Sequence, residues 1–363
     1  MVEYNRFSVG NFTVQEQVTT GNFVIYLIEL CICVIGIITN FMFLVVLWRA
    51  ELLHRNLRIV LFSICFSNFL FGFSRFPITV PLIVAHLYNV EISTVSFCWA
   101  AKSIHHVLMG VPATSFFTVI MERAIASFFY RTYENLQSCH LYGYFLAGFQ
   151  WGFALFMTVI NQIDVASKPN PYTRLPCQIE YSSSKGVFIS IILAYTFNVI
   201  GGFTLWKMIK FNRKLYKQRV WKLKTLSETY QVSENVKSTK IITPLLLIMF
   251  CSNFIFMVIV ALQAVVYILV REAPVNQQDE LTIQLSIKII GRGSEASQSV
   301  DIVSAVTKII FCLIMKSHPI LHRKWSQIFG AKKVEHKIEI PKKLTVLEET
   351  DHYFNSLKLL WEK

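Results

Sequence analysis

Ionisable residues occur in the long apolar stretches of this sequence, either as a pair at the end of a stretch or singly within one. Glu122 and Arg123 are neighbours directly after a long and mostly apolar run. A carboxylate beside a guanidinium can hold a charge-assisted hydrogen bond, whereas a lone arginine in apolar surroundings is costly. Such groups can also bind a polar or charged ligand, or pair with one another as structural ion pairs. Other ionisable side chains that interrupt apolar runs are Glu29, Arg75, Lys102, His105, Asp301 and Lys308.

The sequence lacks the patterns that usually mark catalytic or metal sites. No P-loop, His-Glu-x-x-His, Gly-x-Ser-x-Gly or Cys-x-x-Cys pattern occurs in it. His105 and His106 are adjacent in an apolar run, and on a helix such neighbours cannot both face one metal ion. We therefore expect neither an enzyme nor a bound cofactor or metal.

The composition is typical of a membrane protein. Hydrophobic residues make up 54% and charged residues 16% of the chain, and the mean hydropathy is +0.48, whereas soluble domains carry about a quarter charged residues. Apolar stretches of about twenty residues, enough to cross about 30 Å of hydrocarbon as a helix, recur along the chain. Because lipid-exposed backbone must satisfy its own hydrogen bonds, these stretches should be helical. The sequence predicts an all-α bundle of seven transmembrane helices, near 23–48, 58–86, 98–130, 141–163, 187–210, 241–270 and 299–317.

Lysine and arginine gather on one side of the predicted spans. They are dense in 49–58, in 207–240 and in the C-terminal tail, whereas 1–22 holds one arginine and 87–97 holds no basic residue of either kind. The positive-inside rule therefore places the N-terminus outside and the C-terminus in the cytosol. The net charge of +13 is then a topology signal, so no nucleic-acid partner is expected. Basic segments beside a bilayer also attract anionic membrane lipids.

Both ends of the chain are predicted to lie outside the bundle at 23–317. Residues 1–22 form an extracellular tail, in which the sequon Asn11-Phe12-Thr13 is a possible glycosylation site. In 318–330, apolar residues at helical spacing lie opposite basic ones, which indicates a helix lying in the membrane interface. Residues 331–363 are charged and lack strong periodicity, as is typical of a mobile cytoplasmic tail.

Two of the eight cysteines fall on the predicted outer side. Cys98 opens the third span and Cys177 lies in the loop 164–186. A disulfide between them would hold that loop over the mouth of the bundle, in a compartment that permits disulfides. The alternative is two unpaired extracellular thiols.

Three blocks at predicted cytosolic helix ends carry a narrower resemblance: LHRNL at 53–57, MERAIA at 121–126 with Tyr133-Glu134 after it, and LSETYQVSENVK at 226–237. With seven spans and the cysteine pair, they resemble G-protein-coupled receptors, and in particular the Sra superfamily of nematode serpentine chemoreceptors. Class e is the expected class, and classes ab, b and a remain alternatives. The chain departs from rhodopsin-like receptors, because Ala124 follows Arg123 and the seventh span ends without Asn-Pro-x-x-Tyr.

The resemblance implies a receptor that signals to a heterotrimeric G protein, at the plasma membrane of sensory neurons. Glu122 would restrain Arg123 at rest and release it towards the G-protein α subunit when the cytosolic helix ends part. The alternative is a helix end marked by an arginine that extends to the interface. Further residues expected to take part in coupling are Tyr133, Glu134, Gln231, Glu234 and Asn235.

We expect the ligand site in the outer half of the bundle. Cations and histidine outnumber the two acids there, which favours a polar or anionic small molecule. The alternative at this site is structural ion pairing, such as Arg75 with Glu29 or Asp301. A ligand-gated channel subunit or a small-solute transporter is the alternative function, although no internal repeat is evident. The expected ligand-binding residues are Glu29, Arg75, Lys102, His105 and Asp301, with Lys308 about two turns deeper than Asp301.

Overall fold

The structure is a computed structural model in which the chain divides into two compact units, Met1–Lys324 and Trp325–Lys363. It describes residues 3–9, 12–17, 20–50, 53–88, 95–129, 141–166, 184–217, separate positions between 239 and 261, 302–316 and 319–330.

Five long helices in the first unit are apolar enough to cross a membrane: α1 (Thr20–Arg49), α2 (Arg55–Tyr88), α3 (Val95–Phe128), α5 (Leu141–Ala166) and α6 (Ser184–Lys217). They coincide with the first five predicted stretches to within a few residues, except that α6 continues to residue 217. A further helix, Ile302–Lys316, lies in the seventh stretch and meets the same criteria together with Leu321–Phe329 across a break. In the sixth stretch the described positions are helical.

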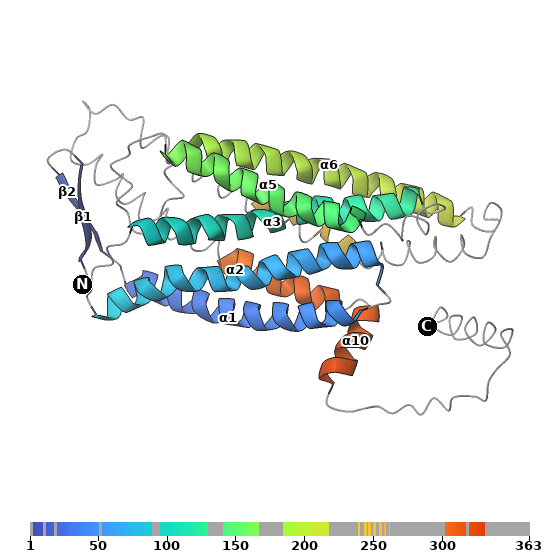
Figure 1. Ribbon diagram of the computed structural model, residues 1–363, viewed down its shortest axis with the longest axis horizontal. Helices are drawn as coiled ribbons and strands as arrows, with labels where there is room; N and C mark the ends of the chain where they lie inside the picture. Colours follow the sequence, from blue (N-terminus) through green and yellow to red (C-terminus); the bar gives the residue numbers. More distant parts are fainter. Residues whose placement is uncertain are drawn as a thin grey trace. The chain divides into compact units, whose positions relative to one another are not determined.

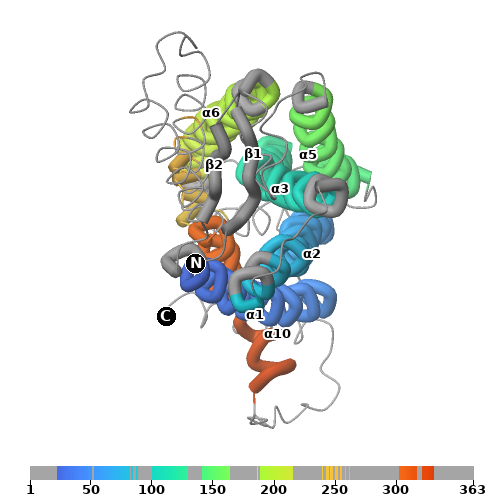
Figure 2. The backbone as a smooth tube through the Cα atoms, turned by 90° about the vertical axis from the view of Figure 1, so that its left-hand side faces the viewer, coloured from blue at the N-terminus to red at the C-terminus, as the bar shows by residue number. Residues whose placement is uncertain are grey.

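Helix α3 is the central element of this bundle. It contacts α2, α5 and α6, while α1 packs against α2, and Figures 1 and 2 show these helices running side by side. Small residues allow a close crossing of α3 and α5, because a Cβ atom added at Gly110 of α3 would lie 2.9 Å from the Cβ of Ala154 in α5. Such contacts between small residues let helix backbones approach each other in membranes.

The N-terminal segment adds a short β-hairpin to the helices. Strand β1 (Glu3–Val9) pairs with β2 (Phe12–Gln17) in antiparallel register, with Val9 opposite Phe12. The sequence predicts only a polar tail here. Two strands of this length do not alter the helical fold class.

Helix α10 (Pro319–Phe329) falls within the predicted interfacial segment 318–330. It begins with proline, whose fixed φ suits the first helical position and whose missing N–H costs no helical hydrogen bond there. In its second half, the rings of Trp325 and Phe329 pack at 5.0 Å. Its location at a membrane interface stays a prediction.

Candidate functional site

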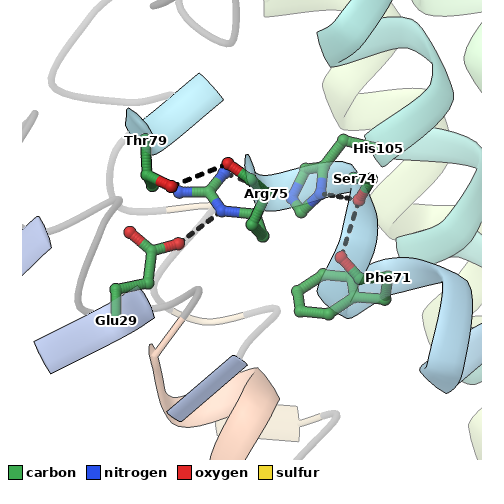
Figure 3. Close-up of polar contacts among 6 residues, drawn as sticks. All are labelled: Glu29, Phe71, Ser74, Arg75, Thr79 and His105. Atoms are coloured by element: carbon green, nitrogen blue, oxygen red, sulfur yellow. Dashed lines mark hydrogen bonds and ion pairs between the residues drawn. The ribbon is translucent and has the colours of Figure 1, made fainter. Parts of the chain in front are cut away.

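A buried charge cluster links α1, α2 and α3. The Arg75 guanidinium of α2 donates through Nε to the Glu29 carboxylate of α1, and its Nη1 lies 3.5 Å from Nε2 of His105 on α3. All three side chains are buried. Figure 3 shows the guanidinium between the carboxylate and the imidazole. The structure thus contains the Glu29–Arg75 ion pair that the sequence left as an alternative, and it brings His105 to the same place.

The neighbours of His105 indicate which ring nitrogen carries hydrogen. The Ser74 hydroxyl donates to the carbonyl oxygen of Phe71 at 2.8 Å, and its oxygen lies 3.0 Å from His105 Nδ1. Because a hydroxyl has one hydrogen to donate, it accepts from Nδ1–H. Nε2 is then the acceptor that faces Arg75. Arg75 is thereby held by two acceptors on two different helices.

Lys308 joins this cluster through an aromatic ring. Its Nζ lies 2.7 Å from the ring centroid of Phe71, and the centroid of the same ring lies 4.8 Å from that of His105. An ammonium over an aromatic face is stabilised by the ring quadrupole. Phe71 also packs with Leu108 and Ala305 in one core cluster. Helix Ile302–Lys316 is therefore part of the same site.

Of the remaining expected ligand residues, Lys102 is buried on α3 one turn before His105, and Asp301 lies outside the described residues. Phe71 and Ser74 were not among the residues expected from the sequence. Helical spacing was the available signal for Phe71, which lies four positions before Arg75 and so shares its face of α2. No such spacing singles out Ser74, which directly precedes Arg75.

At the other end of α3, the neighbouring residues Glu122 and Arg123 form a buried ion pair. Arg123 donates from Nε to one carboxylate oxygen and from Nη2 to the other, the second contact being 2.7 Å long. Glu122 is fully buried and Arg123 is 4% exposed. Two-point contacts between guanidinium and carboxylate are strong and directional. An arginine that snorkelled at a helix end would point into the interface, whereas this one is folded back onto its neighbour.

His54 approaches this pair from the connection between α1 and α2. Its Nδ1 lies 3.7 Å from a carboxylate oxygen of Glu122. Burial lowers the pKa of the His54 imidazole to about 4, while the Glu122 carboxylate acts in the raising direction and the Arg123 guanidinium in the lowering one. His54 is therefore uncharged at neutral pH. As the pH falls from about 6.5 towards 4, protonation favours any state that exposes this imidazole.

One turn beyond Arg123, α3 is tied to α6 and to the start of the sixth stretch. The Asn212 amide of α6 donates to Ser127 Oγ at 3.2 Å and to Thr239 Oγ1 at 3.4 Å. All three side chains are buried. A single amide thus holds three segments together next to the Glu122–Arg123 pair. This contact could not be expected from the sequence, since a single asparagine near a helix end forms no recognisable pattern.

The other expected site residues are not described. Asn11, Tyr133, Glu134, Cys177, Gln231, Glu234 and Asn235 lie outside the described residues, and Cys98 lies within α3 where its side chain is not described. The disulfide, the glycan and these coupling roles therefore stay predictions.

Residues 13–285 match the serpentine type 7TM GPCR receptor class ab chemoreceptor family. The chain belongs to this receptor family. The match is to class ab, which was one of the alternatives; the expected class e and the Sra superfamily are not confirmed. As a member of a receptor family with long apolar helices, the chain is a multi-pass membrane protein and not a member of an enzyme family.

Two curated proteins of Caenorhabditis elegans are similar to this class ab receptor. The chain is 32% identical over 337 residues to the "Probable G-protein coupled receptor F27E5.8", covering 90% of this chain and 87% of that protein. It is 24% identical over 255 residues to "Serpentine receptor class alpha/beta-14", covering 65% of this chain and 64% of that protein.

Proposed function

We propose that this receptor is chemosensory, binds a small polar or anionic molecule at the Glu29–Arg75–His105 cluster, and signals to a cytosolic heterotrimeric G protein through Arg123. The observation that carries the proposal is the burial of ionisable side chains at two separate levels of α3, in a chain whose family consists of serpentine receptors. Buried charges in a membrane bundle are costly and commonly functional.

The charge balance of the outer cluster supports an anionic or polar ligand. Among the described ionisable residues at this level, Arg75, Lys102 and Lys308 are basic and Glu29 is the acid, so basic side chains outnumber acidic ones. A carboxylate or a strongly polar group would be attracted to this region in a low-dielectric bundle. The contact of Arg75 with His105 also connects the ion pair between α1 and α2 to α3. A ligand that binds at Arg75 could therefore change the position of α3.

The inner pair supports a coupling role. The two Glu122 carboxylate oxygens accept from Nε and Nη2 of Arg123, and Asn212 ties α3, α6 and residue 239 together one turn further on. Separation of these helix ends would break the Asn212 contacts and expose Arg123 to a partner. We further propose that this end faces the cytosol, that the N-terminus is outside, and that the receptor resides in the plasma membrane of sensory neurons.

The function is tested with the full chain reconstituted in lipid vesicles together with a heterotrimeric G protein. A panel of small carboxylates, their neutral esters and apolar volatiles is screened for accelerated nucleotide exchange on the G protein. We expect at least one polar or anionic compound to accelerate exchange and its neutral ester to be weaker. If a ligand evoked current across a bilayer without nucleotide exchange, the chain would instead be a ligand-gated channel subunit.

The ligand site is tested separately with variants matched for surface level. Lys102→Ala and His105→Ala should raise the half-maximal ligand concentration roughly ten- to a hundredfold, since contacts to charged groups contribute about 1.5–3 kcal/mol. Thr114→Val, also buried on α3, is the control, because its hydroxyl donates only to the Val111 carbonyl at 3.1 Å. Arg75→Ala is paired with Glu29→Gln, because an unpaired buried carboxylate destabilises the fold. An unchanged half-maximal ligand concentration in both test variants would show that the ligand does not bind at this site.

A further inference from the structure

The last turns of α6 present aromatic and basic side chains along one stripe, which we call the α6 stripe. Phe203 and Trp206 are about half exposed, and the cations that follow them are exposed as well. At about 100° per residue, these positions fall within one third of the helix circumference. Helix α6 contains no aspartate or glutamate. The α6 stripe consists of Phe203, Trp206, Lys207, Lys210, Arg213 and Lys214.

The opposite face of the same turns is occupied by the bundle. Met208 and Asn212 are buried, Asn212 bonds to α3, and the Phe211 ring packs against Phe128 of α3 at 5.0 Å. These contacts fix the rotation of α6 about its axis. The α6 stripe therefore points away from the bundle, where a membrane protein meets lipid.

Two of the cations are held over aromatic rings. Lys210 Nζ lies 3.7 Å from the ring centroid of Trp206, and Lys207 Nζ lies 4.5 Å from that of Phe203. The two rings stack with their centroids 5.8 Å apart. Ring contact restricts both long side chains, so less conformational entropy is lost when an anion binds them.

The depth of the α6 stripe matches the lipid headgroups. The apolar part of α6 begins at Ile189, and about twenty residues from there cross the hydrocarbon core. Trp206, Lys207 and Lys210 therefore lie at its edge, and Arg213 and Lys214 lie about one turn beyond it. Aromatic rings at the boundary with cations just outside are the arrangement that favours an anionic leaflet.

We propose that the α6 stripe binds an anionic phospholipid of the membrane leaflet with a multiply phosphorylated headgroup. Four cations within two turns, without an acid on the helix, can contact more than one phosphate group at once. The phospholipid contact is separate from the outer ligand cluster and from the Glu122–Arg123 pair. It rests on the proposed cytosolic orientation of this end, because anionic phospholipids are concentrated in the cytosolic leaflet.

The binding is tested on the full chain in neutral detergent by native mass spectrometry, with phosphatidylinositol bisphosphate, phosphatidylserine or phosphatidylcholine added. We expect the bisphosphate lipid to be retained most strongly and phosphatidylcholine least. The double variant Lys207→Gln, Lys210→Gln should bind the bisphosphate lipid about twentyfold more weakly, since one cation near a lipid surface accounts for about a factor of five.

The matched control removes two other exposed cations, Arg49→Gln and Arg55→Gln, at the facing ends of α1 and α2. It should change the affinity less than twofold. Equal losses of lipid affinity in both double variants would overturn the proposal and indicate diffuse charge attraction. Unchanged lipid affinity in both double variants would also overturn it. Trp206→Leu keeps every charge but removes the ring under Lys210, and should weaken binding about two- to fivefold. If the α6 double variant bound lipid normally but no longer activated the G protein, the α6 stripe would be a contact for the G protein and not for lipid.

Discussion

Glu122 accepts both guanidinium contacts of Arg123 while fully buried, and His54 lies 3.7 Å from its carboxylate. Burial makes this pair responsive to single substitutions, because removal of one partner leaves the other charge in a low-dielectric environment. The same applies to Glu29 and Arg75 at the outer level. In both places an arginine is held by a carboxylate with a histidine close by.

The inner pair gives the prediction at the residue scale. Glu122→Gln weakens the restraint on Arg123 by about 1–2 kcal/mol and should raise ligand-free nucleotide exchange about five- to thirtyfold. Arg123→Ala should abolish coupling while ligand binding and surface level stay nearly unchanged. Both are measured as basal and ligand-stimulated exchange at matched expression. Normal signalling by Arg123→Ala would exclude the proposed role of this pair and favour 226–237 as the contact with the G protein.

At the scale of elements, the polar positions of α2 explain how it joins its neighbours. Ser63, Ser67, Phe71, Arg75 and Thr79 follow one another at intervals of four, so they form one ridge that turns slowly around the helix axis. Along that ridge Ser63 donates to Gln150 of α5 at 2.8 Å, Ser67 donates to the Leu108 carbonyl of α3 at 3.2 Å, and Arg75 donates to Glu29 of α1. Interhelical hydrogen bonds of this kind hold membrane bundles together alongside close packing.

Close packing of α3 on α5 gives the prediction at this scale. A methyl group added by Gly110→Ala would meet Ala154 at 2.9 Å from its Cβ and 3.0 Å from its Cα. Because the obstacle includes backbone, the helices must move apart, and we expect a destabilisation of about 1–3 kcal/mol, seen as a lower thermal midpoint in detergent. Gly152→Ala on α5 meets nothing within 4 Å and should be neutral or slightly stabilising. Equal midpoints for the two variants would show that this crossing is not tight.

At the scale of the whole molecule, α3 is the element that both levels share. His105 and Glu122 are separated by about 25 Å along the helix axis, at 1.5 Å per residue. Between them, Gly110 packs on Ala154, and Thr118 accepts from Gln150 of α5 at 2.6 Å. A shift of α3 caused at the outer cluster would therefore move the inner pair as well. Nucleotide exchange that depends on outer-cluster variants measures this connection.

The orientation of the molecule gives the prediction at this scale. Asn11-Phe12-Thr13 is the sole Asn-x-Ser/Thr sequon in the sequence. If the N-terminus is outside, a chain expressed in animal cells should shift in mobility on glycosidase treatment, and Asn11→Gln should abolish the shift. A control chain carries an engineered sequon in the C-terminal tail, which should stay unmodified. Glycosylation of the tail and not of Asn11 would show that the orientation is the reverse of the one proposed, with Arg123 on the outer side.

Composition and local pattern were sufficient to determine the class of fold. The hydrocarbon thickness sets the length of an apolar helix, and this requirement is local, so α1, α2, α3, α5 and α6 could be located from the sequence. The candidate functional residues could also be identified from the sequence, because any ionisable residue in such an apolar stretch is unusual. Membership of the serpentine receptors followed from short blocks at helix ends, although class e, the class expected from those blocks, is not confirmed.

Only the tertiary structure decided which charges meet. The sequence left Arg75 equally able to pair with Glu29 or Asp301, and it did not connect His54 with Glu122 or Asn212 with Ser127. These contacts depend on how each helix is rotated about its axis and where it crosses its neighbours, and small residues such as Gly110 and Ala154 set those crossings through packing over the whole bundle. Rotation also decided that Lys207 and Lys210 point away from the bundle while Met208 and Asn212 point into it. Spacing along a chain can group residues on one face of a helix, but what that face meets is decided by the other helices.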